Sequence, residues 1–202
     1  MIIIISNPIT IANEATIINA LFDEGMDVFH LRKPDALSDE LKQLLDNIKP
    51  DYHNKIALHQ HHEIKNEYGI TRLHLTEIKR KEMSEEKMLQ LKDLNNILST
   101  SIHQTEEYQK LSPCFSYTFF GPLFNSISKQ GYTSHLSNGF VFPVEKNLSK
   151  VIAIGGINAT NMQEAMNMKF SGIAVLGAIW QKPNESIQQF TAIQKAWKQI
   201  DQ

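Results

Sequence analysis

The stretch Ile152-Ala-Ile-Gly-Gly-Ile157 runs a short apolar segment directly into paired glycines, and Gly172-Ile-Ala-Val-Leu-Gly-Ala-Ile179 shows a similar pattern after one helix-like segment. Glycine lets the backbone approach an anion closely, and the start of a following helix aims free N–H groups at that anion. A β/α barrel often places a phosphate site at the turns after its last two strands. The two stretches therefore predict a phosphate site at one end of a barrel, although each alone could simply form a tight strand exit.

Short apolar runs alternate with helix-like periodicity along the whole chain, which predicts repeated βα units and a parallel sheet. The predicted strands span Ile2–Ile5, Val28–Arg32, Lys55–His59, Arg72–Leu75, Ile97–Ile102, Phe115–Phe120, Val151–Ile154 and Gly172–Leu176. The predicted helices span Asn13–Phe22, Ser38–Ile48, Ser84–Leu91, Thr105–Leu111, Asn161–Met168 and Glu185–Ile200, with a short one near Glu63–Tyr68.

Eight such units fit either a closed barrel or an open doubly wound sheet. No glycine-rich turn follows the first predicted strand, where a dinucleotide-binding sheet needs one, so we favour the barrel. The 202 residues suit one domain. We therefore predict a single-domain (β/α)8 TIM barrel of the α/β class over residues 1–202, with a loop from Gly131 to Lys150, where Gly, Ser, Asn and Pro interrupt any helical period.

The composition favours a small-molecule ligand. With 20 basic and 22 acidic side chains, the formal charge of -2 gives no electrostatic footprint for nucleic acid or a membrane surface. The single cysteine, Cys114, cannot form an intrachain disulfide, and its surroundings predict a buried thiol. The apolar start Met1–Ile5 is too short for a signal or a membrane span, so we expect a cytoplasmic protein.

Polar side chains recur near the ends of four neighbouring predicted strands. Side chains on a strand alternate between faces, so polar residues separated by one apolar residue share a face. The residues concerned are His30 and Arg32, His59, His74, and Ser99, Ser101 and His103. We expect them to turn inward at the C-terminal mouth, where barrel enzymes place catalytic groups, although each alone could be a hydrogen-bonded or solvated strand end.

Two further groups have competing interpretations. His59, His61 and His62 lack an acidic or cysteine ligand at a matching spacing, so we predict no metal there. The loop after the sixth strand could bind an anion through Ser126, Ser128 and Lys129, or it could be a solvated loop.

Taken together, these segments resemble the thiamine phosphate synthase and TenI superfamily, whose members are β/α barrels acting on thiazole phosphate. The resemblance covers nearly the whole chain and rests on His30-Leu-Arg32, Arg72-Leu-His-Leu75, Ser101-Ile-His103, Tyr117 through Gly121-Pro122 to Lys129, Ala153-Ile-Gly-Gly-Ile157 and Val175-Leu-Gly-Ala178. It implies that Arg32, Ser101 and Lys129 match the residues that hold the pyrophosphate of hydroxymethylpyrimidine pyrophosphate in synthases. It also implies that thiazole phosphate binds at Gly155, Gly156, Ile157, Val175, Gly177 and Ala178.

The chain departs from the synthase pattern at positions that the resemblance links to synthase chemistry. Synthases have a glutamine at His30, a lysine at Pro34, an asparagine–aspartate pair at His59-Gln60, and a second aspartate near Lys79. Their two aspartates bind the magnesium that accompanies pyrophosphate, and an amide with a cation cannot replace two anionic oxygen ligands. Lys33 and Glu77 are the nearest substitutes for the lysine and one aspartate, but each is displaced along the chain.

TenI-type members aromatise a thiazole carboxylate phosphate by moving a proton and need neither pyrophosphate nor magnesium, so the resemblance favours a thiazole tautomerase without a cofactor. Their usual histidine after the sixth strand is Pro122 here. A replacement acid/base would be His30, His59, His74 or His103, because histidine titrates near neutrality. Arg32 and Lys129 would steady the carboxylate.

Two alternatives stay open. One is a magnesium-dependent thiamine phosphate synthase, and the other is a noncatalytic protein that binds thiazole phosphate. The oligomeric state also stays open, a homodimer included.

Overall fold

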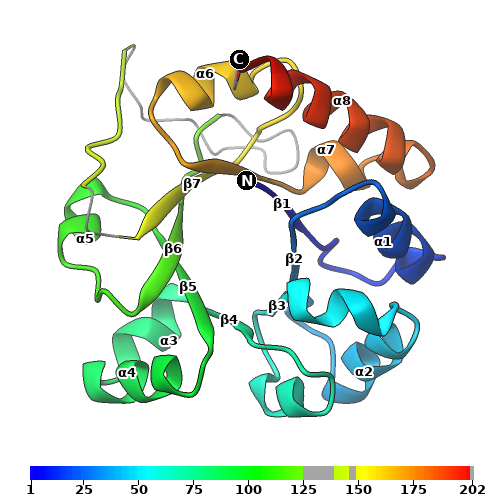
Figure 1. The fold of residues 1–202 in the computed structure, drawn as a ribbon, viewed down its shortest axis with the longest axis horizontal. Helices are drawn as coiled ribbons and strands as arrows, with labels where there is room; N and C mark the ends of the chain where they lie inside the picture. Colours follow the sequence, from blue (N-terminus) through cyan, green and yellow to red (C-terminus); the bar gives the residue numbers. More distant parts are fainter. Residues whose placement is uncertain (125–138, 146–148, 201–202) are drawn as a thin grey trace.

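The computed structural model describes residues 1–124, 139–145 and 149–200. Its strands form a closed parallel barrel in which each strand pairs with the next and β8 pairs with β1, as predicted (Figure 1). The strands are β1 (Ile2–Ile5), β2 (Val28–Leu31), β3 (Ile56–Leu58), β4 (Arg72–Leu75), β5 (Ile97–Ile102), β6 (Phe115–Phe120), β7 (Lys150–Ile154) and β8 (Gly172–Val175).

Helices surround the barrel in chain order (Figure 1). The α-helices are α1 (Glu14–Asp23), α2 (Ser38–Asp46), α3 (Glu77–Glu82), α4 (Glu85–Asp93), α5 (Thr105–Gln109), α6 (Met162–Asn167), α7 (Gly177–Trp180) and α8 (Ser186–Ile200). The 3₁₀ helices are η1 (Pro50–Lys55), η2 (His62–Asn66) and η3 (Pro183–Glu185). No helix in the described ranges has the length and apolar character needed to cross a bilayer.

Some predicted boundaries were wrong. Strands β2 and β3 end one residue early, so Arg32 and His59 lie just beyond them. The short helix predicted near 63–68 is η2, and helices α3 and α7 were not predicted. Of the predicted loop at 131–150, residues 139–145 contain neither helix nor strand, whereas 131–138 and 146–148 lie outside the described residues.

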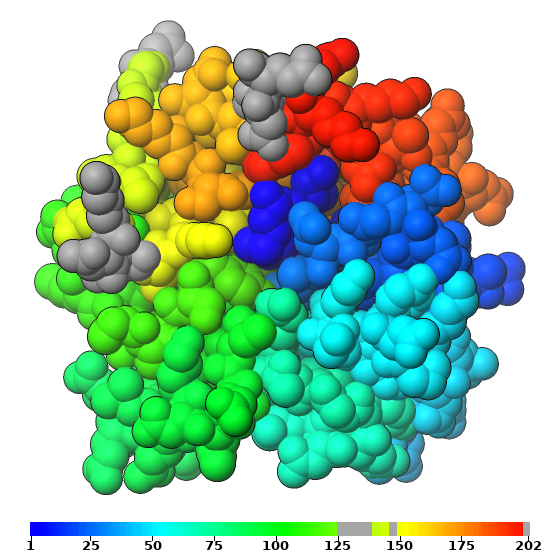
Figure 2. Space-filling view, viewed as in Figure 1, coloured from blue at the N-terminus to red at the C-terminus, as the bar shows by residue number. Residues whose placement is uncertain are grey.

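The termini of the barrel sequence meet at the β1–β8 ladder, where the Ile173 N–H donates to the Met1 carbonyl at 3.1 Å. In the space-filling view the N-terminal residues, in blue, lie beside the C-terminal segment, in red (Figure 2). This pairing closes the sheet and forces alternate side chains into a shared interior.

The barrel interior has an apolar part and a polar part. The apolar part is a small cluster made by Ile3, Ile5, Val28, Tyr117, Phe119, Ile152 and Ala174. The polar part comes from β2 to β5 and contains His30, His59, His74 and Ser99, all buried. The outward-facing apolar side chains pack under the helices in a separate, larger core. The interior is therefore polar on the side where sequence alternation predicts polar residues.

A buried ion pair fixes the chain that leaves β2. The Lys33 ammonium lies 2.6 Å from Glu14 Oε2 and donates to the Ile9 carbonyl at 2.9 Å, and the two charged side chains are only 2% and 1% exposed. Burial raises the pKa of Glu14 and lowers the pKa of Lys33, while their mutual hydrogen bond and attraction oppose both shifts. The pair thereby ties the β1–α1 connection to the residue that follows Arg32.

We expect Glu14→Gln and Lys33→Met to lower the free energy of unfolding by about 3–5 kcal/mol each, because each leaves one buried charge without its partner. The double variant removes both charges, so it should recover most of that loss. Urea denaturation of the wild type, both single variants and the double variant measures the coupling. Losses that simply add in the double variant would show that the two side chains do not stabilise each other.

Candidate functional site

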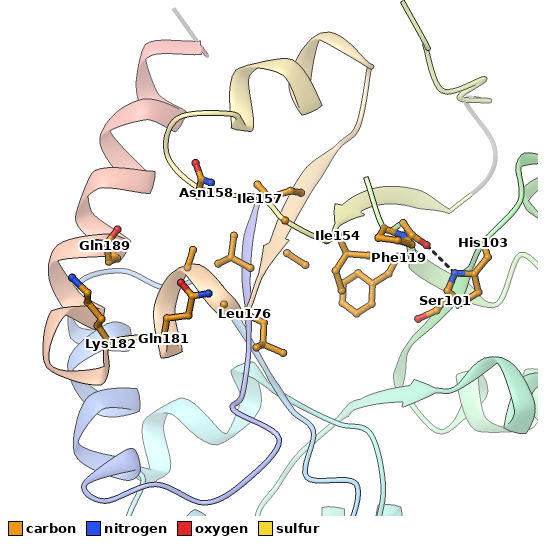
Figure 3. A pocket seen from close by; sticks show the side chains of 18 of the residues that line it. Ser101, His103, Phe119, Ile154, Ile157, Asn158, Leu176, Gln181, Lys182 and Gln189 are labelled. Atoms are coloured by element: carbon orange, nitrogen blue, oxygen red, sulfur yellow. Dashed lines mark hydrogen bonds between the residues drawn. The ribbon is translucent and has the colours of Figure 1, made fainter. Parts of the chain in front are cut away.

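A cavity of about 710 Å³ opens at the C-terminal ends of β5 to β8 (Figure 3). Three segments line it. The ends of β5 and β6 contribute Ser101, Ile102, His103, Phe119, Gly121 and Pro122. The exits of β7 and β8 contribute 154–158 and 174–178, and the segment from α7 to α8 contributes Gln181, Lys182, Glu185 and Gln189. The cavity therefore lies at the end of the barrel where the sequence predicts the site.

The exits of β7 and β8 present free backbone donors to this cavity. Within the described residues, no hydrogen bond uses the N–H groups of Gly156, Ile157, Gly177 or Ala178. Gly156 has a φ of 65°, which glycine adopts without strain, and the Asn161 side chain donates to its carbonyl at 2.9 Å. Four unpaired donors on two adjacent turns form a wall suited to a phosphate.

Close packing requires glycine at position 155. A Cβ there would lie 2.7 Å from Pro122 Cα, and φ is 101°. The same contact is held by two backbone bonds, from the Leu123 N–H to Ile154 O at 2.8 Å and from the Phe124 N–H to Gly155 O at 3.1 Å. The exits of β6 and β7 are thereby locked together along one side of the cavity.

His103 is the cavity histidine with an open ring nitrogen. Its Nδ1 donates to the Gly121 carbonyl at 2.8 Å, and its Nε2 lies 3.6 Å from Glu77 Oε2 (Figure 3). The side chain is 58% exposed. Because the carbonyl can only accept, it fixes the proton on Nδ1 in the neutral ring. Nε2 is then free to accept a proton.

The other three predicted histidines are buried and do not line the cavity. His30 and His59 are hydrogen-bonded to each other, and His74 stacks on His59. His30 Nδ1 lies 2.9 Å from His59 Nε2, and His30 Nε2 lies 2.7 Å from the Tyr117 hydroxyl. The third ring, His74, lies 3.0 Å from Ser99 Oγ through Nδ1 and 3.3 Å from Ser101 Oγ through Nε2. Since Ser101 lines the cavity, its hydroxyl connects His74 to the cavity wall.

Burial keeps the three interior rings neutral. It lowers the pKa of His74 to about 3 and the pKa of His30 and His59 well below the ordinary value, with the charges of Arg32 and Arg72 and of the neighbouring rings acting in the same direction. Burial likewise raises the pKa of Tyr117 to about 12. All four groups are therefore uncharged near neutral pH.

One nitrogen from each interior histidine lies within 4.8 Å of the others, a spacing compatible with a metal. However, His59 and His74 stack with ring centroids 4.0 Å apart and planes 22° from parallel, so their in-plane lone pairs do not converge on one point. The same burial and positive charges that oppose an imidazolium also oppose a divalent cation. The arrangement favours hydrogen bonding between the rings over metal ligation.

The sequence profile of the TMP-TENI family, described as thiamine monophosphate synthase, matches residues 2–179. The chain belongs to this family. Thiamine-phosphate synthase of Lysinibacillus sphaericus (strain C3-41) is 32% identical over 110 residues, which are 52% of this chain and 50% of that protein. The match thus spans about half the length of that relative.

Two solved structures of thiamine phosphate pyrophosphorylases are similar over almost the whole chain. The protein from Bacteroides thetaiotaomicron is 29% identical, with a TM-score of 0.76 and coverage of 98% of this chain and 97% of that chain. The protein from Pyrococcus furiosus has a TM-score of 0.77 and coverage of 98% and 96%, but at 17% identity it shows a shared fold alone.

Within the thiamine monophosphate synthase family, this chain has a donor set that does not fit magnesium at the expected positions. Gln60 donates its amide to the Lys33 carbonyl, and Lys79 is an exposed cation on α3. The nearby carboxylate of Glu77 is paired with Lys81. Lys33 cannot replace the missing lysine, because its ammonium is buried against Glu14. Magnesium prefers anionic oxygen ligands, and these positions do not supply a pair of them.

The remaining predicted residues fall in different places. Ser101 and the six predicted phosphate-site residues line the cavity. Arg32 does not line it: this residue is exposed just beyond β2, and its backbone N–H and carbonyl both bond to Ser6 Oγ. Ser126, Ser128 and Lys129 lie outside the described residues. Sequence reasoning missed Phe119, which shares a face with Tyr117 on β6 and was therefore detectable from alternation. It also missed Gln181 and Gln189, which line the cavity and which no sequence pattern indicates.

We expect the stability of the protein to fall as the pH drops from about 6.5 toward 5. The folded state resists protonation of its buried histidines and the unfolded chain accepts it, so each such histidine contributes up to about 1.4 kcal/mol per pH unit. His74→Asn should reduce the dependence of the unfolding free energy on pH by up to about 1.4 kcal/mol per pH unit, which corresponds to one proton. Urea denaturation at several pH values measures the difference between the two proteins, and equal slopes would contradict the neutral state assigned to His74.

Proposed function

We propose that the protein binds a thiazole phosphate in the cavity and acts in thiamine biosynthesis. The observation that carries this proposal is the set of four unpaired backbone N–H groups at Gly156, Ile157, Gly177 and Ala178. Membership of the thiamine monophosphate synthase family supports the same ligand class.

The rest of the cavity suits a small heterocycle. Apolar side chains of Phe119, Ile154 and Leu176 line it between the phosphate wall and the β5 end (Figure 3). Polar groups follow on the far side, where Ser101 and His103 face the same space. An apolar pocket with a few placed polar groups is typical of a small-molecule site.

The first candidate reaction is thiamine phosphate synthesis, in which the thiazole nitrogen captures a pyrimidine carbocation after pyrophosphate leaves. The names of the relatives favour this reaction. Ser101 and the exposed cation Arg32 would contact pyrophosphate, together with Lys129. Gln60 and Lys79 do not supply the anionic ligands that magnesium would need beside this pyrophosphate.

The second candidate is aromatisation of a thiazole carboxylate phosphate by proton transfer. The missing acidic ligands favour this reaction, since it requires no metal. A histidine with an open ring nitrogen in the same cavity as the phosphate wall also favours it.

Gly156→Ala tests the phosphate site. We expect the Kd for thiazole phosphate to rise by more than about tenfold, because the Cβ strains the turn and displaces its donors. Gly69→Ala is the matched control, since Gly69 has a φ of 64° and open space around it but lies outside the cavity. Titration calorimetry measures both. An equal effect of the two substitutions would remove the phosphate wall from the proposal.

Two assays on the wild type separate the reactions. Thiamine phosphate formed from thiazole phosphate and hydroxymethylpyrimidine pyrophosphate with magnesium would establish the synthase. Aromatisation of the exocyclic thiazole carboxylate phosphate faster than in buffer would establish the tautomerase. Micromolar binding of thiazole phosphate with neither reaction would leave a noncatalytic binding protein, and no binding would end the proposal.

A further inference from the structure

The four histidines proposed for acid/base chemistry differ in whether they can reach a ligand. His30, His59 and His74 are buried, bonded to one another or to hydroxyl groups, and absent from the cavity wall. His103 lines the cavity and has one ring nitrogen that accepts no protein hydrogen bond in the described residues. Access therefore singles out His103.

The backbone fixes the orientation of this ring. His103 Nδ1 donates to the Gly121 carbonyl at 2.8 Å, which leaves the lone pair on Nε2. The carbonyl itself has little freedom, because a Cβ at Gly121 would lie 2.0 Å from Ile154 O. Tight packing between the exits of β6 and β7 thus holds His103 in one tautomer.

A carboxylate faces the open nitrogen from another element. Glu77 begins α3, and its Oε2 lies 3.6 Å from His103 Nε2. The charged groups around this pair are Lys81 and Arg80 on α3 and Glu107 on α5, whose carboxylate also accepts the His103 backbone N–H at 2.9 Å. When His103 takes up a proton, Glu77 is placed to stabilise the imidazolium.

We propose that His103 transfers the proton at this site and that Glu77 is its positioning residue. The role of His103 rests on the tautomerase reaction proposed above. The C–H bond at the saturated ring carbon breaks, an N–H bond forms at Nε2, and the electron pair enters the ring. The exocyclic carbon then takes a proton back from Nε2, so the product is an isomer and no oxidant or reductant is needed.

The chain offers closely matched variants for a test. His103→Asn keeps an N–H that can reach the Gly121 carbonyl but removes the base. His61→Asn is the control, because His61 makes the same pair of contacts outside the cavity: Nε2 to the Ala36 carbonyl at 2.9 Å and Nδ1 to Glu63 at 3.1 Å. His61 has a φ of 53°, which asparagine tolerates.

We expect His103→Asn to lower kcat for aromatisation by about 100-fold or more and to change KM by less than about threefold. His61→Asn should match the wild type. If His103→Asn keeps its activity, His103 is not the proton-transfer residue although the tautomerase stands. If the wild type itself does not aromatise the ligand, the proposed reaction fails first and the role of His103 fails with it.

Glu77→Gln separates positioning from a structural role. Removing the carboxylate should lower kcat by about tenfold and change KM by less than about threefold, because the imidazolium formed during the reaction loses its anionic neighbour. Lys81→Gln breaks the other ion pair of Glu77 and should leave both constants unchanged. An unchanged kcat in Glu77→Gln, or a rise in KM alone, would overturn the positioning role.

The tautomer gives a readout that needs no activity. A long-range ¹H–¹⁵N correlation spectrum at pH 8 should show His103 protonated at Nδ1 and bare at Nε2. A ring protonated at Nε2 would overturn the geometry on which the proposal depends, whatever the kinetics show.

Discussion

Closure of the parallel ladder between β1 and β8 is the constraint from which the rest of the molecule follows. Register pairs Ile3 with Ala174 and Ile4 with Val175, so the first and last strands share one continuous sheet. Once the sheet is closed, every second side chain must enter a narrow common interior. The strands then differ in the side chains that they contribute to this interior. Those on one side place aliphatic and aromatic groups, and those on the other place imidazoles and hydroxyls.

The sequence predicts this architecture well because its signals are local. Period-two alternation predicts that His30, Ser99 and Ser101 face the interior, and the glycine turns predict which strand exits line the cavity. What the sequence could not show is depth along the strand. His74 pairs with Ser99 inside the sheet and is sealed within the barrel, whereas His103 follows the end of β5 and lies in the cavity. Strand rise carries the chain about 13 Å between Ser99 and His103, and alternation alone does not report this distance.

A residue that is close in sequence to a missing functional residue does not necessarily replace it in space. Lys33 is next to position 34, where synthases have a lysine. Its side chain, however, is buried against Glu14 at the start of α1. A shift of a single residue reverses the face of an extended segment, so a charge displaced by one position points away from the site. The family relationship and the donor set therefore carry different information: the first fixes the scaffold, and the second limits the chemistry that its cavity can support.

Gly121 has a consequence for how this protein is compared with its relatives. The residue carries no side chain, yet the space it leaves empty lets β6 approach β7 and aims a carbonyl at His103. The tautomer of the imidazole thus depends on close packing at the exit of β6. A side chain at 121 would clash with Ile154 O and shift the carbonyl that accepts from the ring. Positions 103 and 121 therefore have to be compared together. A relative with the histidine but without the glycine should not be assumed to have the same histidine chemistry.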